Sequence, residues 1–505
     1  MSRVNGVSPG FCLGGDKMWC FQSRKGPKLL IMVLAGVLLI GLYQDQTWAA
    51  EPDPPASRSE AGETDQAREV LEWQKQLREE EEQRREAEAP LERPEFFPVI
   101  EPVRPSENLQ VGPATGTLAP YGYAWAEDTL SRGWTFHRLG PFRVSPFLAY
   151  NGIYRSNIYQ TSTDKKSDYV NNLRPGLSLE LPLAHRHRLS LGYLGDYFIY
   201  SSHSTDSHYD HNVNADANFN FRGGLSLGFG SAYRHATEER SAVVGRKRRY
   251  DRTTPYFKAA YAFADVWKLE TNYQFDNLDF AKAIDRQDDY QYHTGGATLF
   301  YKFWPKTAAL VQYIIQGRVY PNRSINDSLS HSPLIGLTWD PTAKLSGTVK
   351  FGYTFREYDT DLAGRNNSPN SWALAMQTLY RYSRYTNLAL TAQRSYQDDV
   401  DFGNNAYENS AVYVTLNKHW HYFRTDSYLA FYYINNNYVN VAADPVTGRL
   451  KERDDDIISV GCGLSQPFTS YFRLRLDYNF INKDSNFSTY SFNEHRLLFG
   501  IETSL

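Results

Sequence analysis

The sequence predicts an all-β protein, a transmembrane antiparallel up-and-down β-barrel of about eighteen strands, preceded by an export signal and a charged extension. Three observations predict this fold. Polar and apolar residues alternate from residue 142 to the C-terminus, and the connections between the alternating stretches are tight and long in turn. Aromatic residues make up 15% of a chain in which only 41% of residues are hydrophobic, which is typical of strands that face lipid on one side and water on the other.

The alternation is clearest in residues 267–276. Their odd positions are Trp, Leu, Thr, Tyr and Phe, and their even positions are Lys, Glu, Asn, Gln and Asp. Successive side chains of a strand point to opposite faces, so this segment has one largely apolar face and one polar face. Residues 213–221 and 472–480 repeat the pattern, whereas residues 371–382 and 428–438 follow it poorly.

The connections distinguish a membrane barrel from a water-soluble sandwich, which also alternates. Tight turns recur near residues 184, 223, 264, 305, 341, 383, 420 and 467, and polar loops such as Thr237–Arg249, Asp359–Pro369 and Ala442–Asp455 lie between them. The spacing of about forty residues fits two strands of membrane-crossing length plus one loop. Short periplasmic turns and long outer loops are the asymmetry expected of an outer-membrane barrel.

Eighteen strands can be placed, an even number that leaves both barrel ends in the periplasm. They are predicted to begin near Arg143, Asp168, His187, Tyr209, Leu225, Asp251, Trp267, Tyr290, Ala308, Ser328, Leu345, Ser371, Thr386, Glu408, Phe423, Asp456, Tyr471 and Tyr490.

The first 49 residues are predicted to be a signal peptide with an extended basic region. A basic stretch that includes Lys28 precedes the apolar run Leu29–Leu42, and cleavage is expected near Ala49 and Ala50. The run is too short to span a bilayer comfortably, although an inner-membrane anchor is the alternative. Because this basic stretch lies far from Met1, Met18 is an alternative start of the chain.

Two further segments precede the barrel, which is assigned to residues 143–505. Residues 50–106 are rich in Glu, Gln and Arg and flanked by Pro, which predicts a flexible or helical periplasmic tether. Residues 107–142 are rich in Gly, Pro and aromatic residues and are assigned to a pre-barrel segment or a small plug.

The polar positions of the strands predict a wet lumen of mixed charge. With 54 Lys and Arg against 57 Asp and Glu, the chain has no basic excess that would suit nucleic acid. Rings of charge set the ion preference of a pore, and balanced signs select weakly. We therefore expect Arg475→Ala to assemble normally and to change only ion preference. The predicted lumen-lining residues are Arg188, Asp196, Lys268, Glu270, Asp276, Lys350, Arg356, Arg473, Arg475 and Asp477.

The first predicted hairpin resembles a known family, the putative β-barrel porin 2 family. The resemblance lies in a Tyr–Asn–aromatic stretch, an Asp that opens the second strand, and a Pro-Gly-Leu; here these carry Tyr154, Asn157, Asp168, Pro175 and Gly176. Arg155 and Ser156 stand where the family often has an acidic residue. Members often occur with exopolysaccharide and capsule gene clusters, so the resemblance implies a polysaccharide cargo and periplasmic export components as partners.

No catalytic constellation and no cofactor or metal site is predicted. His185 with His187 and His419 with His421 are spaced to share a strand face, but turn histidines beside lipid headgroups are the favoured interpretation. The acidic stretches 398–401 and 454–456 are expected in outer loops as solvated charge, because they lack the fixed spacing of a calcium loop. An inward aromatic residue such as Phe198 is a candidate for stacking on sugar rings.

The sequence therefore favours an outer-membrane pore that exports an exopolysaccharide or oligosaccharide. Its expected surroundings are outer-membrane lipid and the barrel assembly machinery, and no nucleic acid. A general or nutrient-uptake porin for small solutes is the first alternative, and a non-transport structural or enzymatic barrel is the second.

Overall fold

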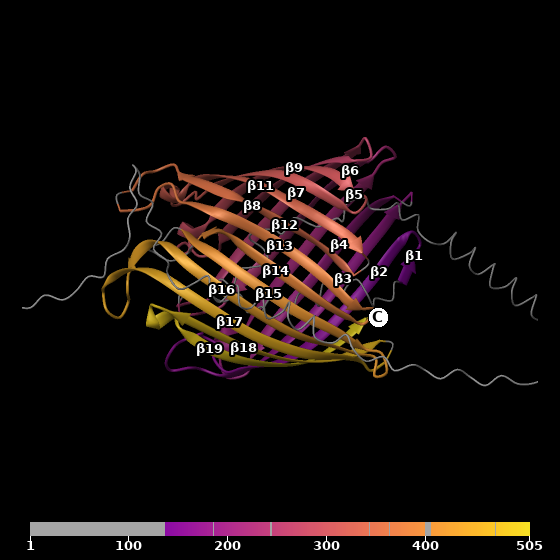
Figure 1. Ribbon diagram of the computed structural model, residues 1–505. Coiled ribbons are helices and arrows are strands. Elements are labelled where there is room, and N and C mark those ends of the chain that lie inside the picture. The colour runs from indigo at the N-terminus through magenta and orange to yellow at the C-terminus, as the bar shows by residue number, and fades with distance from the viewer. Residues whose placement is uncertain are drawn as a thin grey trace, which may run out of the picture. The chain divides into compact units, whose positions relative to one another are not determined.

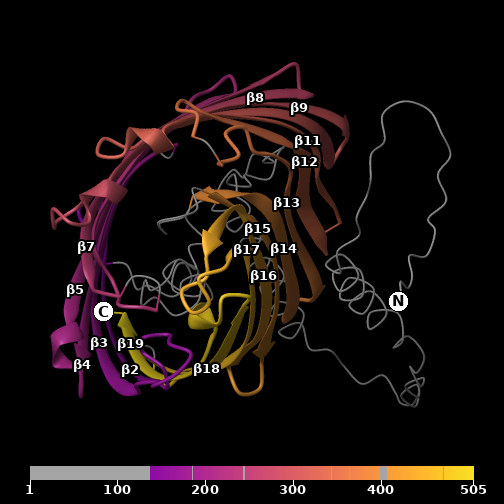
Figure 2. The same ribbon diagram turned by 90° about the vertical axis from the view of Figure 1, so that its left-hand side faces the viewer.

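A closed antiparallel β-barrel makes up the part of the chain that the structure describes. The computed structural model describes residues 137–184, 186–242, 245–342, 344–362, 364–398, 406–469 and 471–504, so the predicted signal peptide, the tether 50–106 and most of segment 107–142 lie outside the described residues. Each strand pairs with the next along the chain, and the last strand pairs with β2, which closes the wall (Figure 1 and Figure 2).

Eighteen long strands, β2 to β19, form the wall, and the short strand β1 pairs with β2 beside its start. The first ten strands are β1 (His137–Leu139), β2 (Phe142–Arg155), β3 (Asp168–Leu183), β4 (His187–Tyr200), β5 (His208–Asn220), β6 (Leu225–Glu238), β7 (Arg248–Phe263), β8 (Trp267–Phe280), β9 (Tyr290–Trp304) and β10 (Thr307–Val319). The others are β11 (Ser328–Thr342), β12 (Leu345–Tyr358), β13 (Asn370–Ser383), β14 (Thr386–Asp398), β15 (Ala406–Trp420), β16 (Thr425–Ala443), β17 (Leu450–Pro467), β18 (Phe472–Ser485) and β19 (Phe492–Ser504).

The predicted fold class and the predicted number of barrel strands are confirmed. Eight of the eighteen predicted starts coincide with the first residue of the observed strand, and most others differ by one or two residues. The eight tight turns join consecutive strands at one end of the barrel, where β1 and the C-terminal end also lie (Figure 1). Gly223 and Gly224 have φ of 105° and 86°, which a turn this tight between β5 and β6 requires.

The hairpin of β16 and β17 corrects the predicted loop Ala442–Asp455. These strands have 19 and 18 residues, so residues 450–456, expected in a loop, belong to β17. The polar stretch stays extended because its side chains pair across strands: Asn435 on β16 donates to Asp454 at 2.8 Å, and Lys483 on β18 contacts Asp455 at 3.0 Å. The acidic residues 454–456 are thus strand residues, whose side chains alternate between the two faces.

The opposite end of the barrel carries the long loops. Four short 3₁₀ helices lie within the described parts of these loops: η1 (Ser204–Asp206), η2 (Arg286–Asp288), η3 (Ser324–Asn326) and η4 (Ser488–Tyr490). Within the part of the chain that the structure describes, no helix has the length and apolarity needed to span a membrane.

Apolar packing inside the wall explains the weak alternation of residues 428–438. Tyr432 and Ile434 of β16 are each 1% exposed and pack with Ile457 and Ile481 of the next two strands. Both faces of this segment are therefore apolar, so the sequence alternates poorly there. A second cluster contains Ile153, Val170 and Leu498, and it holds the first, second and last wall strands together.

Candidate functional site: the polar wall of the barrel

The two faces of the wall differ in chemistry along each strand. On β18, Leu476 and Tyr478 are 46% and 39% exposed on one face, while Asp477 between them is 7% exposed on the other. Large exposed apolar side chains belong to the convex side of a closed barrel, and crowded polar side chains belong to its concave side. By this alternation, each of the ten predicted lumen-lining residues lies on the polar face of its strand.

Most of these charges form ion pairs along the wall. Asp196 on β4 pairs with Arg174 on β3 at 2.6 Å, and Lys268 pairs with Glu270 at 2.7 Å along β8. Arg252 on β7 holds both oxygens of Asp276, with its Nε 2.8 Å from Oδ1. Paired charges of opposite sign offset each other, so the wall exerts a weaker net field than its number of charges suggests.

Three predicted residues contact the wall more loosely or through neutral partners. Lys350 donates to the side-chain oxygen of Gln312 at 3.1 Å, and Arg356 donates to the hydroxyl of Ser330 at 3.2 Å. Arg188 is exposed at the turn end, 4.0 Å from Glu180.

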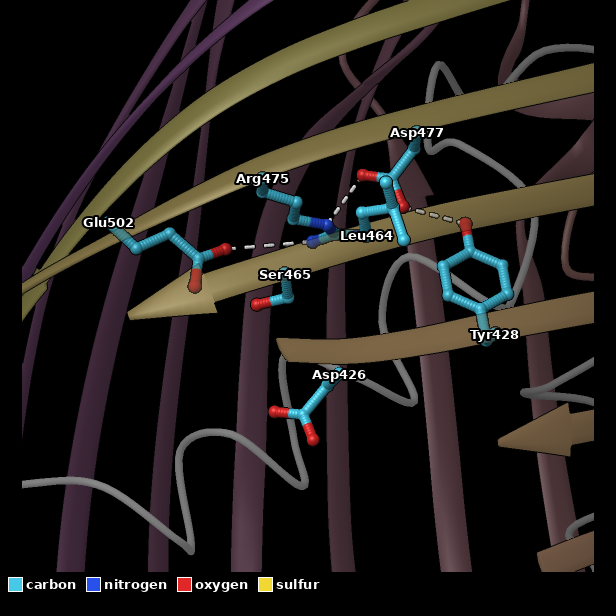
Figure 3. A pocket seen from close by; sticks show the side chains of 7 residues that line it. All are labelled: Asp426, Tyr428, Leu464, Ser465, Arg475, Asp477 and Glu502. Carbon is cyan, nitrogen blue, oxygen red and sulfur yellow. Dashed lines mark hydrogen bonds and ion pairs between the residues drawn. The ribbon is translucent and has the colours of Figure 1, made fainter. Parts of the chain in front are cut away.

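A small hollow at the turn end is lined by two of the remaining predicted residues, Arg475 and Asp477, and the third, Arg473, contacts another residue of its lining (Figure 3). Arg475 pairs with Asp477 at 2.6 Å and lies 3.6 Å from Glu502 on β19. Tyr428 on β16 donates to Asp477 at 2.7 Å. Arg473 lies 3.5 Å from Asp426, whose carboxylate also lines the hollow. The hollow is therefore lined by one guanidinium group and three carboxylates, and the Arg473 guanidinium contacts one of these carboxylates.

A ladder of amides, interrupted by the carboxylate of Asp216, which accepts from Asn214 at 3.1 Å, runs along the polar face of β5. Asn212, Asn214 and Asn220 are exposed to solvent, and Asn218 is half-buried. The neighbouring strands give these amides room through glycine: a Cβ added to Gly192 would come within 2.3 Å of the Asn214 side chain. Amide groups offer both donors and acceptors without charge, which is the chemistry that binds sugar hydroxyls.

A buried charged network lies at the loop end, and sequence reasoning missed its partners. Arg155 at the end of β2 donates from Nε to Glu494 on β19 at 2.6 Å and from Nη1 to Glu239 in the β6–β7 loop at 2.7 Å. Tyr200 donates to Glu239 at 2.5 Å, and Arg496 donates to Glu494 at 2.7 Å. The side chains of Arg155, Glu239 and Glu494 are at most 7% exposed.

Charge pairing controls the ionisation of the loop carboxylate in this network. Burial raises the pKa of Glu239, but the adjacent Arg155 guanidinium, together with His208 and the hydrogen bond from Tyr200, outweighs burial and holds that pKa below its ordinary value. The β6–β7 loop is therefore attached to the first strand by an ionised group. One feature of the sequence could have indicated this contact: Arg155 stands where the family often has an acidic residue.

Comparison with protein families decides what kind of barrel this is. The model of the family described as Putative beta-barrel porin 2 matches residues 137–504. The chain belongs to this family. The predicted resemblance is thus confirmed, and the protein is an outer-membrane β-barrel porin.

Solved structures with a similar fold have low sequence identity to this porin. OccK2 (OpdF) of Pseudomonas aeruginosa is 12% identical, with 72% of this chain and 98% of that chain covered and a TM-score of 0.44. OccK1 (OpdK) of the same organism is 12% identical, with coverages of 72% and 99% and a TM-score of 0.42. OccAB4 of Acinetobacter baumannii is 11% identical, with coverages of 72% and 99% and a TM-score of 0.40. No curated protein matches the chain.

Two family-motif residues of this porin hold its outer loops in place. Asn157 is 0% exposed; its side-chain amide donates to the carbonyl oxygens of Thr161 at 2.8 Å and Asn493 at 3.1 Å. Asp168 accepts from the backbone N–H groups of Ser202 and His203, both at 2.9 Å. The motif therefore ties the first loop to the start of β19 and the β4–β5 loop to β3.

The other motif residues shape the first strands of the porin. Tyr154 is 44% exposed on the outer face. Gly176 lies where a Cβ would come within 3.3 Å of Phe147 and of a β4 carbonyl oxygen, so the backbones approach closely there. Pro175 has no N–H to donate, and the β3–β4 register skips it between Leu173 and Gly176.

The remaining candidate side chains have structural partners. Among the described residues, no group of three or more His, Cys, Asp or Glu side chains could hold a metal. His419 contacts Asp426 at 2.8 Å, and His421 stacks on Tyr385; His185 lies outside the described residues. Phe198 is 7% exposed and stacked on His208, so the predicted stacking on sugar rings is wrong for this side chain.

Proposed function

We propose that this porin lets a neutral, hydroxyl-rich oligosaccharide or exopolysaccharide pass outwards across the outer membrane without energy input. The amide ladder of β5 supports the proposal most directly. Its exposed Asn side chains offer hydrogen bonds in both directions, whereas most wall charges contact opposite charges. A neutral polymer can exchange hydrogen bonds with such a wall without having to leave a strong ionic site.

The proposal includes the partners expected from the sequence. The signal peptide would be removed near Ala49 and Ala50, and the periplasmic tether 50–106 would receive cargo from export components. Deletion of residues 51–106 behind an intact signal should then lower export without changing the conductance of the purified barrel.

A test combines genetics with single-channel recording. Deletion of the gene should reduce surface polysaccharide, and a neutral oligosaccharide should interrupt the current through the purified full-length porin. Asn212→Leu with Asn214→Leu should shorten these interruptions by about thirtyfold, since each of the two lost hydrogen bonds contributes about 1 kcal/mol. The matched control is Asn277→Leu on the outer face of β8, which should change nothing. Unchanged surface polysaccharide together with unchanged interruptions would refute the proposal.

A nutrient-uptake porin for small solutes is the second candidate. The hollow at the turn end favours it, because guanidinium and carboxylate groups lie side by side there and suit a small zwitterion. A freely conducting channel whose current is interrupted by amino acids and not by oligosaccharides would support uptake. A barrel with no conductance would instead support a structural or enzymatic role.

A further inference from the structure

The outer face of the barrel carries a repeated hydrogen bond between neighbouring strands. In each instance a tyrosine hydroxyl contacts a side chain on the next strand, two residues beyond its direct partner. Four of these pairs join tyrosine to a histidine Nδ1: Tyr193 and His211 at 3.0 Å, Tyr273 and His293 at 2.9 Å, Tyr313 and His331 at 2.7 Å, and Tyr478 and His495 at 2.9 Å. Three others use an amide or a carboxylate: Tyr150 and Asn171, Tyr233 and Asp251, and Tyr433 and Asp456, each at 2.6 Å.

The register shows that these pairs form one belt. Tyr193 faces Val213 directly and bonds His211, and Tyr273 faces Gly295 and bonds His293. The tyrosines at positions 193, 233, 273 and 313 are spaced at equal intervals along the chain, one per hairpin. Equal intervals through similar hairpins place the hydroxyls at the same height around the wall. We call this row the tyrosine belt.

The tyrosine belt lies on the loop side of the apolar band of mid-strand residues such as Leu191 and Phe229, and a few exposed apolar side chains such as Ile199 and Val319 lie beyond it. Large aromatic side chains, among them Tyr301 and Trp420, border the same band at the turn end. On β11 the distance from His331 to Trp339 is eight residues, or about 27 Å along the strand. At the usual strand tilt this corresponds to about 20 Å across the membrane, close to the thickness of the apolar band in outer-membrane barrels. The belt therefore lies at the level of the outer-leaflet headgroups.

One part of the belt gathers two histidines and one arginine around the ring of Tyr209, beside the Asp251 carboxylate that contacts His235. His211 and His235 have ring centroids 6.3 Å apart, and both lie next to the ring of Tyr209. Arg249 is exposed at the start of β7, with its guanidinium 5.7 Å from the centre of the same ring. We call His211, His235 and Arg249 the basic patch.

The histidine contacts of the basic patch leave its second ring nitrogens for another partner. Nδ1 of His211 is bonded by Tyr193, and Nδ1 of His235 lies 2.9 Å from Asp251. His211, whose Nδ1 accepts from the Tyr193 hydroxyl, carries its proton on Nε2, which is then a donor; Nδ1 of His235 instead donates to the Asp251 carboxylate, so Nε2 of His235 is a donor only when that ring is protonated. Towards the turn end, the exposed apolar side chains Leu191, Phe229 and Phe257 continue the same surface. Hydrogen-bond donors lie towards the loop end and an apolar surface lies towards the turn end. This arrangement matches a phosphorylated headgroup and its acyl chains.

We propose that the basic patch binds the phosphate group of a phosphorylated outer-leaflet glycolipid, whose acyl chains lie against the apolar face of β4 to β7. The site is separate from the lumen of the barrel, because these residues lie on the outer face of their strands. The partner is a lipid and not free phosphate, since the apolar surface adjoins the donors.

Native mass spectrometry of the full-length porin in detergent tests this proposal with lipid A as the probe. The unaltered protein should retain lipid A, and the variant His211→Gln, His235→Gln, Arg249→Gln should bind it at least about tenfold more weakly, because charge-assisted hydrogen bonds to phosphate are lost. Dephosphorylated lipid A should bind the unaltered protein as weakly as lipid A binds the variant. Inorganic phosphate at the same concentration should displace none of the bound lipid.

Matched controls keep the proposal open to refutation. His331→Gln with His495→Gln removes two histidines of the same belt that lie outside the basic patch, and it should leave binding unchanged. Heat-modifiable migration on gels verifies that each variant is folded. An equal loss in both variants would overturn the site, as would undiminished binding by the triple variant. Displacement by inorganic phosphate would overturn the lipid as its occupant.

Discussion

Two buried arginines at opposite ends of the wall each contact two carboxylates, but they join different parts of the chain. Arg475 at the turn end contacts Asp477 on its own strand and Glu502 on the next strand. Arg155 at the loop end contacts Glu494 across the closure between β2 and β19, and Glu239 in a loop four strands away. The turn-end group balances local charge, whereas the loop-end group determines where a loop lies and how the barrel closes.

The largest expected effect is that of Arg155→Ala. Glu239 and Glu494 would stay buried without their shared counter-ion, so we expect a loss of about 3–5 kcal/mol in the free energy of unfolding. Urea unfolding in phospholipid vesicles measures this loss. The control Arg143→Ala removes a half-exposed arginine that lies 3.6 Å from Glu180, and it should cost less than about 1 kcal/mol. Similar losses in both variants would show that the buried network of Arg155 stabilises the fold no more than a half-exposed ion pair does.

A smaller effect is expected from Arg475→Ala. Alternation alone predicts normal assembly, but the observed contacts change that expectation because Asp477 and Glu502 would lose their shared cation. We expect a cost of about 1–3 kcal/mol together with a shift towards cation preference. Reversal potentials in a salt gradient measure the shift, and Arg475→Lys should restore the preference. Normal stability in Arg475→Ala would support the original expectation.

The smallest expected effect is a loss of stability at low pH that depends on Glu239. Because the pKa of Glu239 is lower when folded than its ordinary value of about 4.5, its contribution to stability is present above that value and is lost as the pH falls through the folded pKa. Unfolding measured from about pH 7 to pH 3 should show an acid-dependent decline that is smaller in Glu239→Gln. An identical decline in that variant would assign acid sensitivity to other groups.

Sequence reasoning predicted the wall well because a strand exposes its two faces in strict alternation. The start of β8 at Trp267 and the tight turn at residues 223–224 follow from local pattern and glycine chemistry. The β16–β17 hairpin was predicted too short, since polar residues such as Asp454 pair beyond the apolar band.

The partners of the polar side chains were beyond prediction for a different reason. The contact between Arg155 and Glu239 joins residues 84 positions apart through a loop, and no periodicity records such a meeting. The sequence likewise places the histidines of the tyrosine belt one by one, but only the strand register shows that each faces a tyrosine on its neighbour.

The contact between Arg155 and Glu494 also limits the order in which the barrel can be built. The two residues are 339 positions apart, so the first wall strand must wait for the last before its arginine obtains this partner. A chain that stops before β19 would leave Arg155 with Glu239 but without Glu494, and most backbone groups along the edge of β2 would have no strand to pair with. The final strand therefore completes the sheet and the charge pairing of Arg155 in the same step, which penalises release of an unfinished barrel into the membrane.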